Sequence, residues 1–158
     1  MTTYNQTELN EKTRNEMELI FDALSENESL ARIAVTAFMA SKNPTMEEIA
    51  DVKTAVSEAV TNSIIHGYEG GEGKVYMRCR LEDTTLFVEI EDKGIGIDNL
   101  EQAMEPLYTS KPDMNRSGMG FSFMEAFMDE LEVISTPMMG TCVKMQKEIG
   151  NSPWIDEE

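Results

Sequence analysis

The chain has 158 residues, 41% of them hydrophobic and 27% charged, which suits one well-buried core and is too short for two ordinary domains. Its formal net charge of −17 disfavours direct nucleic-acid binding, because that binding depends on cationic contacts with phosphates. It has no apolar run near the roughly 20 residues of a membrane span and no signal-peptide pattern at its start. We expect Cys79 and Cys142 to be buried free thiols and the protein to be cytoplasmic, without membrane contact.

The first part of the chain predicts a strand and a helix. Residues 1–13 are polar and aperiodic, and we expect a flexible extension there. Apolar and polar side chains then alternate, which predicts a strand that contains Met17, Leu19 and Phe21. Residues 25–28 have the Ser-x-x-Glu form of a capping box and should open a helix. The apolar stripe of that helix is expected to consist of Leu30, Ile33, Ala34, Ala37 and Phe38.

A second, longer helix is predicted after the break at Asn43-Pro44. Its capping box spans residues 45–48, and Gly67 should end it just after His66. Its apolar side should carry Ile49, Val52, Val56, Ala59, Val60 and Ile64.

The second half of the chain predicts mainly strands. Alternating apolar residues on both sides of a turn near 82–84 predict a β-hairpin from 75 to 90. The remaining expected elements are a short helix at 100–104, a helix from about 118 to 130, and strands at 131–136 and 141–147. Helices segregated from a mostly antiparallel sheet give an α+β fold, a two-layer α/β sandwich with the helices on one face. We expect one domain over 14–149 and an acidic tail over 150–158.

The first polar motif lies near the end of the longer helix. Glu58 and Asn62 are four residues apart and share a helix face, with His66 close to it. Such a strip could hold a hard cation, since Mg²⁺ takes few protein ligands besides water and phosphate. A solvated polar face explains the same spacing equally well.

The second motif, Asp92-Lys93-Gly94-Ile95-Gly96, directly follows a predicted strand. Gly94 and Gly96 would let the backbone approach a ligand closely, and Asp92 could accept a hydrogen bond from an exocyclic amine. A glycine-rich turn capped by an aspartate is the alternative interpretation.

The third motif comprises Arg116, Ser117, Gly118 and Gly120 at a helix start. Free backbone N–H groups at a helix N-terminus, together with an arginine, favour phosphate binding. A merely flexible helix start is the alternative. The preceding loop, about 98–116, is long enough to act as a lid.

The order of these motifs, followed by Gly140-Thr141, resembles the ATPase superfamily of gyrase, Hsp90, histidine kinases and MutL. Within that superfamily the chain is similar to the sporulation anti-sigma-F factors, which are serine protein kinases, over nearly all of residues 14–149. The similarity is carried by the segments SEAVTNSIIHGY, LEDTTLFVEIEDKGIGI, PLYTSKP and RSGMGFSFMEAFMDELEV.

The resemblance implies an Hsp90/histidine-kinase type of fold, ATP or ADP and Mg²⁺ as cofactors, and a role for each motif. Glu58 would be the general base, Asn62 the Mg²⁺ ligand and Asp92 the partner of the adenine amine. Gly94 and Gly96 would shape the adenine pocket, and Thr141 would support it. The phosphates would be held by Arg116, Ser117, Gly118 and Gly120.

The resemblance also implies protein partners. The chain would be a homodimer that binds a sigma factor of the sigma-F type and phosphorylates a serine of the anti-anti-sigma factor, with Arg32 contacting both partners. Met17–Phe21 is our candidate dimer edge, because unpaired strands invite pairing. His66 is expected to close the helix structurally. Since it is the only histidine and lies inside the first motif, a self-contained histidine kinase is excluded. An anti-sigma kinase of the stress-response (sigma-B) branch and a non-catalytic, nucleotide-gated sigma-binding module stay open.

Overall fold

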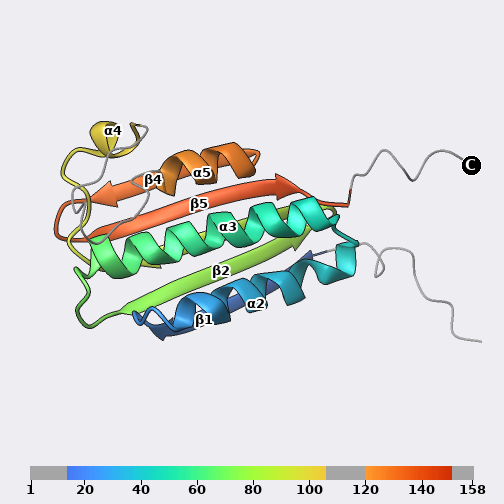
Figure 1. Ribbon diagram of the computed structural model, residues 1–158, viewed down its shortest axis with the longest axis horizontal. Helices are drawn as coiled ribbons and strands as arrows, with labels where there is room; N and C mark the ends of the chain where they lie inside the picture. The colour runs from blue at the N-terminus through green and yellow to red at the C-terminus, as the bar shows by residue number, and fades with distance from the viewer. Residues whose placement is uncertain (1–13, 106–119, 151–158) are drawn as a thin grey trace, which may run out of the picture.

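The computed structural model describes residues 14–105 and 120–150, which form one sheet and a layer of helices (Figure 1). No helix within these two ranges is both long and apolar enough to cross a membrane. The elements are β1 (Arg14–Asp22), α2 (Asn27–Met39), η1 (Ala40–Lys42), α3 (Met46–Asn62), η2 (Ser63–Gly67), β2 (Lys74–Glu82), β3 (Thr85–Asp92), α4 (Leu100–Ala103), α5 (Gly120–Phe127), β4 (Glu130–Thr136) and β5 (Gly140–Glu148).

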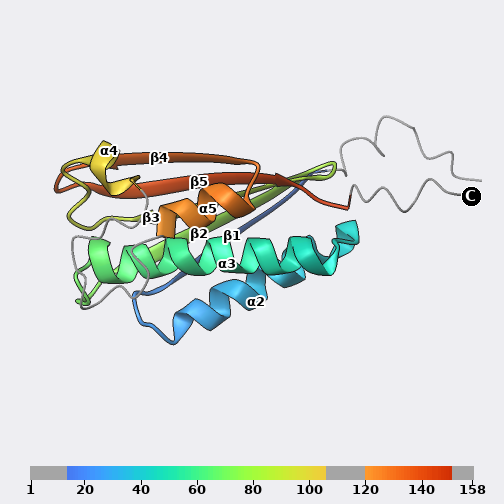
Figure 2. The ribbon, with the colours of Figure 1, turned by 45° about the horizontal axis from the view of Figure 1, so that its top comes forward.

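The sheet has five strands in the order β1-β2-β3-β5-β4, and every neighbouring pair is antiparallel. Helices α2, α3 and α5 lie on one side of it, as Figure 2 shows, so the predicted two-layer α+β sandwich is confirmed. The expected extension 1–13 and nearly all of the tail 150–158 lie outside the described residues.

The core lies between the sheet and α3. The alternation predicted for the hairpin is confirmed, because the apolar side chains of β2 and β3 are buried. Cys79 belongs to this core, and burial raises the pKa of its thiol to about 12. Cys142 is also a free thiol but only half-buried, since its position on β5 alternates with the core-facing Thr141 and Val143.

Helix α2 differs from the sequence prediction in two ways. Its buried face is formed by Ala31, Val35 and Met39, whereas Leu30 and Ile33 are 43% and 67% exposed. Small and large apolar residues surround this helix, so the 3.6-residue period fits more than one side. Of the predicted stripe, Phe38 packs against the core, but Leu30 and Ile33 do not.

The capping box predicted at Ser25–Glu28 is also absent, and the helix begins without a side-chain cap at Glu26. The physical reason is that the carboxylate of Glu28 accepts hydrogen bonds from Arg32 and Ser57 and so does not bond the backbone N–H at the helix start. The second predicted box is confirmed: Thr45 and Glu48 cap α3 reciprocally.

Candidate functional site

One end of the candidate site is built around Asp92, the last residue of β3. Its side chain is 4% exposed, and Oδ1 accepts a hydrogen bond from the backbone N–H of Gly94 at 3.0 Å. Burial raises the pKa of this carboxyl, while hydrogen bonds from Gly94, the Ser63 side chain and the backbone of Thr141 oppose that shift. A buried carboxylate with these donors is fixed in place before any ligand arrives.

Glycines make the close packing around Asp92 possible. A Cβ added to Gly94 would lie 2.0 Å from the carbonyl oxygen of Gly67, which itself accepts the N–H of Ile95 at 2.9 Å. A Cβ on Gly67 would lie 2.7 Å from the carboxyl of Asp92. Gly96 combines a φ of +73° with a Cβ position 2.2 Å from the carbonyl of Thr136. The end of η2 and the segment after β3 therefore touch through backbone atoms.

Thr141 supports this end from the neighbouring strand. It stands opposite Asp92 in the β3–β5 register and is 9% exposed. Its hydroxyl lies 2.7 Å from Ser135 Oγ, which in turn accepts the backbone N–H of Ile97 at 2.8 Å. The segment after Asp92 is thus tied to the β4–β5 pair.

Sequence reasoning missed three residues of this end: Ser63, Tyr68 and Ser135. Ser63 lies inside the first motif and faces Asp92 because α3 finishes in the π-helical turn η2. The Tyr68 hydroxyl accepts the N–H of Lys93 at 2.8 Å. Ser135 could have been found only from its strand register opposite Thr141, which the sequence does not give.

The other end of the site consists of side chains on α3. A Cβ on Gly120, at the start of α5, would lie 3.1 Å from Asn62 Nδ2 and 3.3 Å from Glu58 Oε2. The first and third motifs therefore meet directly. Desolvation, followed by the charge of Glu28, raises the pKa of the half-buried Glu58, which makes its carboxylate a stronger proton acceptor.

The side chains at this end offer oxygen donors of the kind that bind Mg²⁺. Within 14–105 and 120–150, no group of three or more His, Cys, Asp or Glu side chains is placed to hold a metal ion. Asn62 supplies a side-chain carbonyl oxygen beside the Glu58 carboxylate, and Mg²⁺ is commonly held by one or two protein oxygens plus phosphates and water. His66 is half-buried in η2, and its role stays a prediction.

Of the predicted phosphate-binding residues, the structure describes Gly120. Arg116, Ser117 and Gly118 lie outside the described residues, as does 106–119, most of the predicted lid. The described beginning of that loop contains the short helix α4, which Figure 1 shows at the same end of the molecule as η2.

Arg32 lies on α2 and contacts α3 at Ser57, the residue before Glu58. Its Nη1 donates to Glu28 Oε1 and to Ser57 Oγ, both at 3.0 Å, and its Nη2 donates to Ser29 Oγ at 2.9 Å. Its side chain is 32% exposed. The exposed Leu30 and Ile33 flank it on the same helix.

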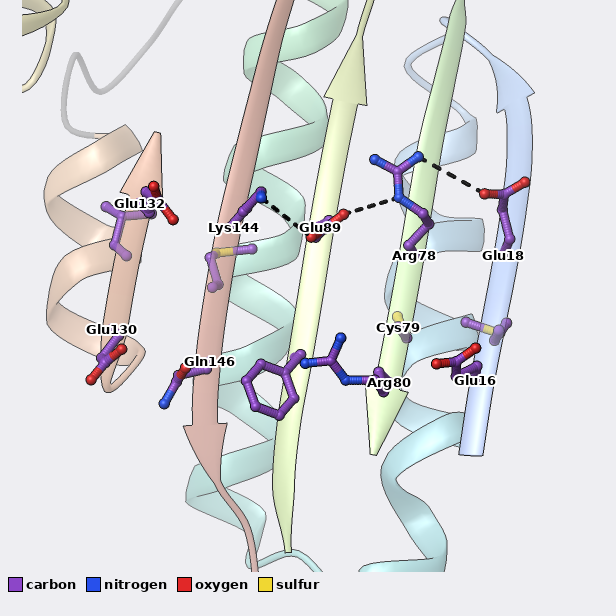
Figure 3. A pocket seen from close by; sticks show the side chains of 14 residues that line it. Glu16, Glu18, Arg78, Cys79, Arg80, Glu89, Glu130, Glu132, Lys144 and Gln146 are labelled. Carbon is purple, nitrogen blue, oxygen red and sulfur yellow. Dashed lines mark hydrogen bonds and ion pairs between the residues drawn. The ribbon is translucent and has the colours of Figure 1, made fainter. Parts of the chain in front are cut away.

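A separate hollow of about 650 Å³ lies on the open face of the sheet (Figure 3). Cross-strand ion pairs occupy it: Arg78 contacts Glu18 at 3.9 Å and Glu89 at 3.0 Å, and Lys144 contacts Glu89 at 3.8 Å. Its lining contains none of the predicted site residues that the structure describes. We interpret it as a solvated, charge-paired sheet surface.

The family model of the histidine kinase-like ATPase domain matches residues 21–147. The chain is 57% identical over 140 residues to the anti-sigma F factors of Bacillus thuringiensis (strain Al Hakam) and Bacillus mycoides (strain KBAB4), covering 88% of this chain and 96% of each relative. Among solved structures, it is similar to the RsbU and RsbW domains of Rv1364c from Mycobacterium tuberculosis, with a TM-score of 0.62 and 19% identity. That similarity covers 85% of this chain and 32% of the other, and it shows the fold alone.

Proposed function

Because the chain belongs to the anti-sigma F factor family and contains a histidine kinase-like ATPase domain, we propose that it inhibits a sigma-F type sigma factor and phosphorylates its antagonist. The phosphoryl group of ATP would pass to a serine of the anti-anti-sigma factor. That transfer would inactivate the antagonist and leave the sigma factor bound.

The observation that carries this proposal is the meeting of Glu58, Asn62 and Gly120. A proton acceptor, an oxygen ligand suited to Mg²⁺ and the start of a glycine-led helix lie within a few ångströms of one another. Nucleotide binding alone would not require a half-buried carboxylate with a raised pKa at this position. This arrangement favours phosphoryl transfer over a purely nucleotide-gated module.

In the proposed reaction, Asp92 accepts a hydrogen bond from the adenine amine, in a pocket shaped by Gly94 and Gly96 and supported by Thr141. Mg²⁺, held by Asn62, would neutralise charge on the phosphates. Glu58 accepts the proton of the partner serine as its Oγ bonds to the γ-phosphorus, and the bond to the ADP oxygen breaks. Arg116, Ser117, Gly118 and Gly120 would hold the phosphates.

Protein binding would use α2 and the sheet edge. Arg32 is the proposed contact to both partners, and the exposed Leu30 and Ile33 beside it give the apolar surroundings typical of an interface arginine. β1 lies at one edge of the sheet, which leaves its outer side available for pairing in the proposed homodimer. Light scattering that detected only monomer would remove the dimer from the proposal.

The decisive experiment is phosphoryl transfer between purified proteins. The chain is incubated with labelled ATP, Mg²⁺ and an anti-anti-sigma protein, and the labelled residue is identified by mass spectrometry. We expect label on one serine of that protein. If a sigma factor is retained in a nucleotide-dependent pull-down while no serine is labelled, the kinase proposal fails and a nucleotide-gated binding module replaces it.

A further inference from the structure

Glu28, Arg32 and Ser57 form a triangle of polar side chains that connects α2 and α3. Arg32 Nη1 donates to both of the others at 3.0 Å, and the Ser57 hydroxyl donates to the same Glu28 oxygen. All three side chains are half-buried. Each member is therefore held by two partners, which restricts the rotamers of a long, flexible arginine.

The triangle leaves part of the guanidinium unused. An arginine has five N–H donors, and the bonds to Glu28, Ser57 and Ser29 occupy three of them. Within the described ranges, the other two N–H groups of Arg32 have no acceptor, and its side chain is 32% exposed. Two directed donors on a fixed group suit an acceptor such as a carboxylate on a docking protein.

The triangle is also adjacent to the proposed base. Ser57 immediately precedes Glu58 on α3, and the charge of Glu28 acts on the Glu58 carboxyl. A protein held by Arg32 is thus linked, through one serine hydroxyl, to the helical turn that carries Glu58.

From this geometry we propose that Ser57 and Glu28 are positioning residues that orient Arg32 and fix a docked protein substrate relative to Glu58. The inference rests on the proposed function and deepens it, because it names side chains that connect partner docking to phosphoryl transfer. A simple structural link between two helices is the competing explanation. The two differ in whether the effect of Ser57 passes through Arg32.

The test is a double-mutant cycle on the full-length protein. We expect Ser57→Ala to raise the KM for the anti-anti-sigma protein about 3- to 10-fold, because Arg32 must then be ordered on binding. ATP affinity and melting temperature should stay near the wild-type values, and Ser57→Thr, which keeps the hydroxyl, should restore the KM. In an Arg32→Ala background, Ser57→Ala should have no further effect.

Thr36→Ala is the matched control. Thr36 lies on the same helix as Arg32. Among the residues that the structure describes, its hydroxyl bonds only the backbone oxygen of Arg32, so its loss should leave the KM unchanged. Additive effects of Ser57→Ala and Arg32→Ala, or an unchanged KM in Ser57→Ala, would overturn the inference. If the wild type transfers no phosphate, the proposed function fails instead, and the same cycle measured on partner affinity still decides the role of Ser57.

Discussion

The two ends of the candidate site are built from different parts of the chain. Around Asp92 the contacts leave no room for further side chains: a Cβ on Gly94 would meet the backbone of Gly67, and a Cβ on Gly67 would meet the carboxyl of Asp92. Around Glu58 and Asn62 the contacts are made by half-buried side chains that project from α3 toward Gly120. Substitutions that disturb the packing at the Asp92 end should therefore damage folding and nucleotide binding together, whereas loss of the Glu58 carboxylate should damage chemistry alone.

The largest effect is expected from Gly94→Ala. The new methyl group would lie 2.0 Å from a backbone oxygen of Gly67, and neither backbone can move without disturbing Asp92. Overpacking of this kind costs about 1–3 kcal/mol and occasionally more, and here we expect the upper end. Thermal unfolding should show a clear loss of stability, and calorimetric titration should show loss of ATP binding.

Gly71→Ala is the control for that change. Gly71 is exposed in the loop between η2 and β2, and its added Cβ would need a neighbour to shift by only a few tenths of an ångström. Its melting temperature and ATP affinity should stay close to those of the wild type. Equal behaviour of the two variants would mean that the Asp92 end is not a rigid backbone structure.

Glu58→Gln should separate chemistry from binding. The amide keeps the size of the side chain but cannot accept the serine proton, so transfer should slow by about 100-fold or more. ATP affinity and stability should change little, because Glu58 is half-buried and takes no part in the Asp92 packing.

Asp92→Ala should have the opposite effect to Glu58→Gln, because it should weaken ATP binding itself. Loss of a charged hydrogen-bond acceptor should weaken ATP binding roughly 10- to 150-fold, the equivalent of about 1.5–3 kcal/mol. A variant at Asp92 that bound ATP as tightly as the wild type would contradict the adenine assignment. A variant at Glu58 that lost ATP affinity would show that the two ends are not separable.

Ile33→Ser tests the exposed surface of α2 as a docking site for the protein partners. Ile33 is 67% exposed, so the substitution should leave the melting temperature nearly unchanged. If α2 docks the protein partners, affinity for them should fall about 5- to 30-fold, as for other interface anchors. Met46→Ser is the control, because Met46 is 82% exposed at the start of α3 and should not affect binding. Unchanged partner affinity in Ile33→Ser would remove this part of α2 from the interface.

Helix α2 shows where a sequence pattern no longer predicts which side of an element is buried. Strands β2 and β3 and helix α3 were predictable because each has one apolar side, so the period alone orients it. Helix α2 has apolar residues on two sides, and the structure buries Ala31 and Val35 and leaves Leu30 and Ile33 outside. Side-chain size therefore does not predict which side of a helix is buried, because small residues let the inner side of the helix lie close to the sheet.

For the site, the sequence supplied residue types but not their contacts. Glu58 and Asn62 share a face by helical spacing, so their proximity was predictable. That Gly120 would pack against both depends on how α5 lies beside α3, a tertiary relation that no local pattern encodes. The link from Arg32 to Ser57 joins residues 25 positions apart and was invisible for the same reason.

The smallest effect is expected from Thr141→Val, which tests whether any side chain matters at the Asp92 end besides Asp92 itself. Valine keeps the volume and the backbone N–H that faces Asp92, and it removes only the hydroxyl that contacts Ser135 Oγ at 2.7 Å. One neutral hydrogen bond is worth about 0.5–1.5 kcal/mol, so ATP affinity should fall roughly 2- to 10-fold, and Thr141→Ser should recover it. Fluorescent-nucleotide competition can measure this difference. If Thr141→Val binds ATP like the wild type, the hydroxyl does not support the pocket, and the Asp92 end consists of one carboxylate in a backbone frame.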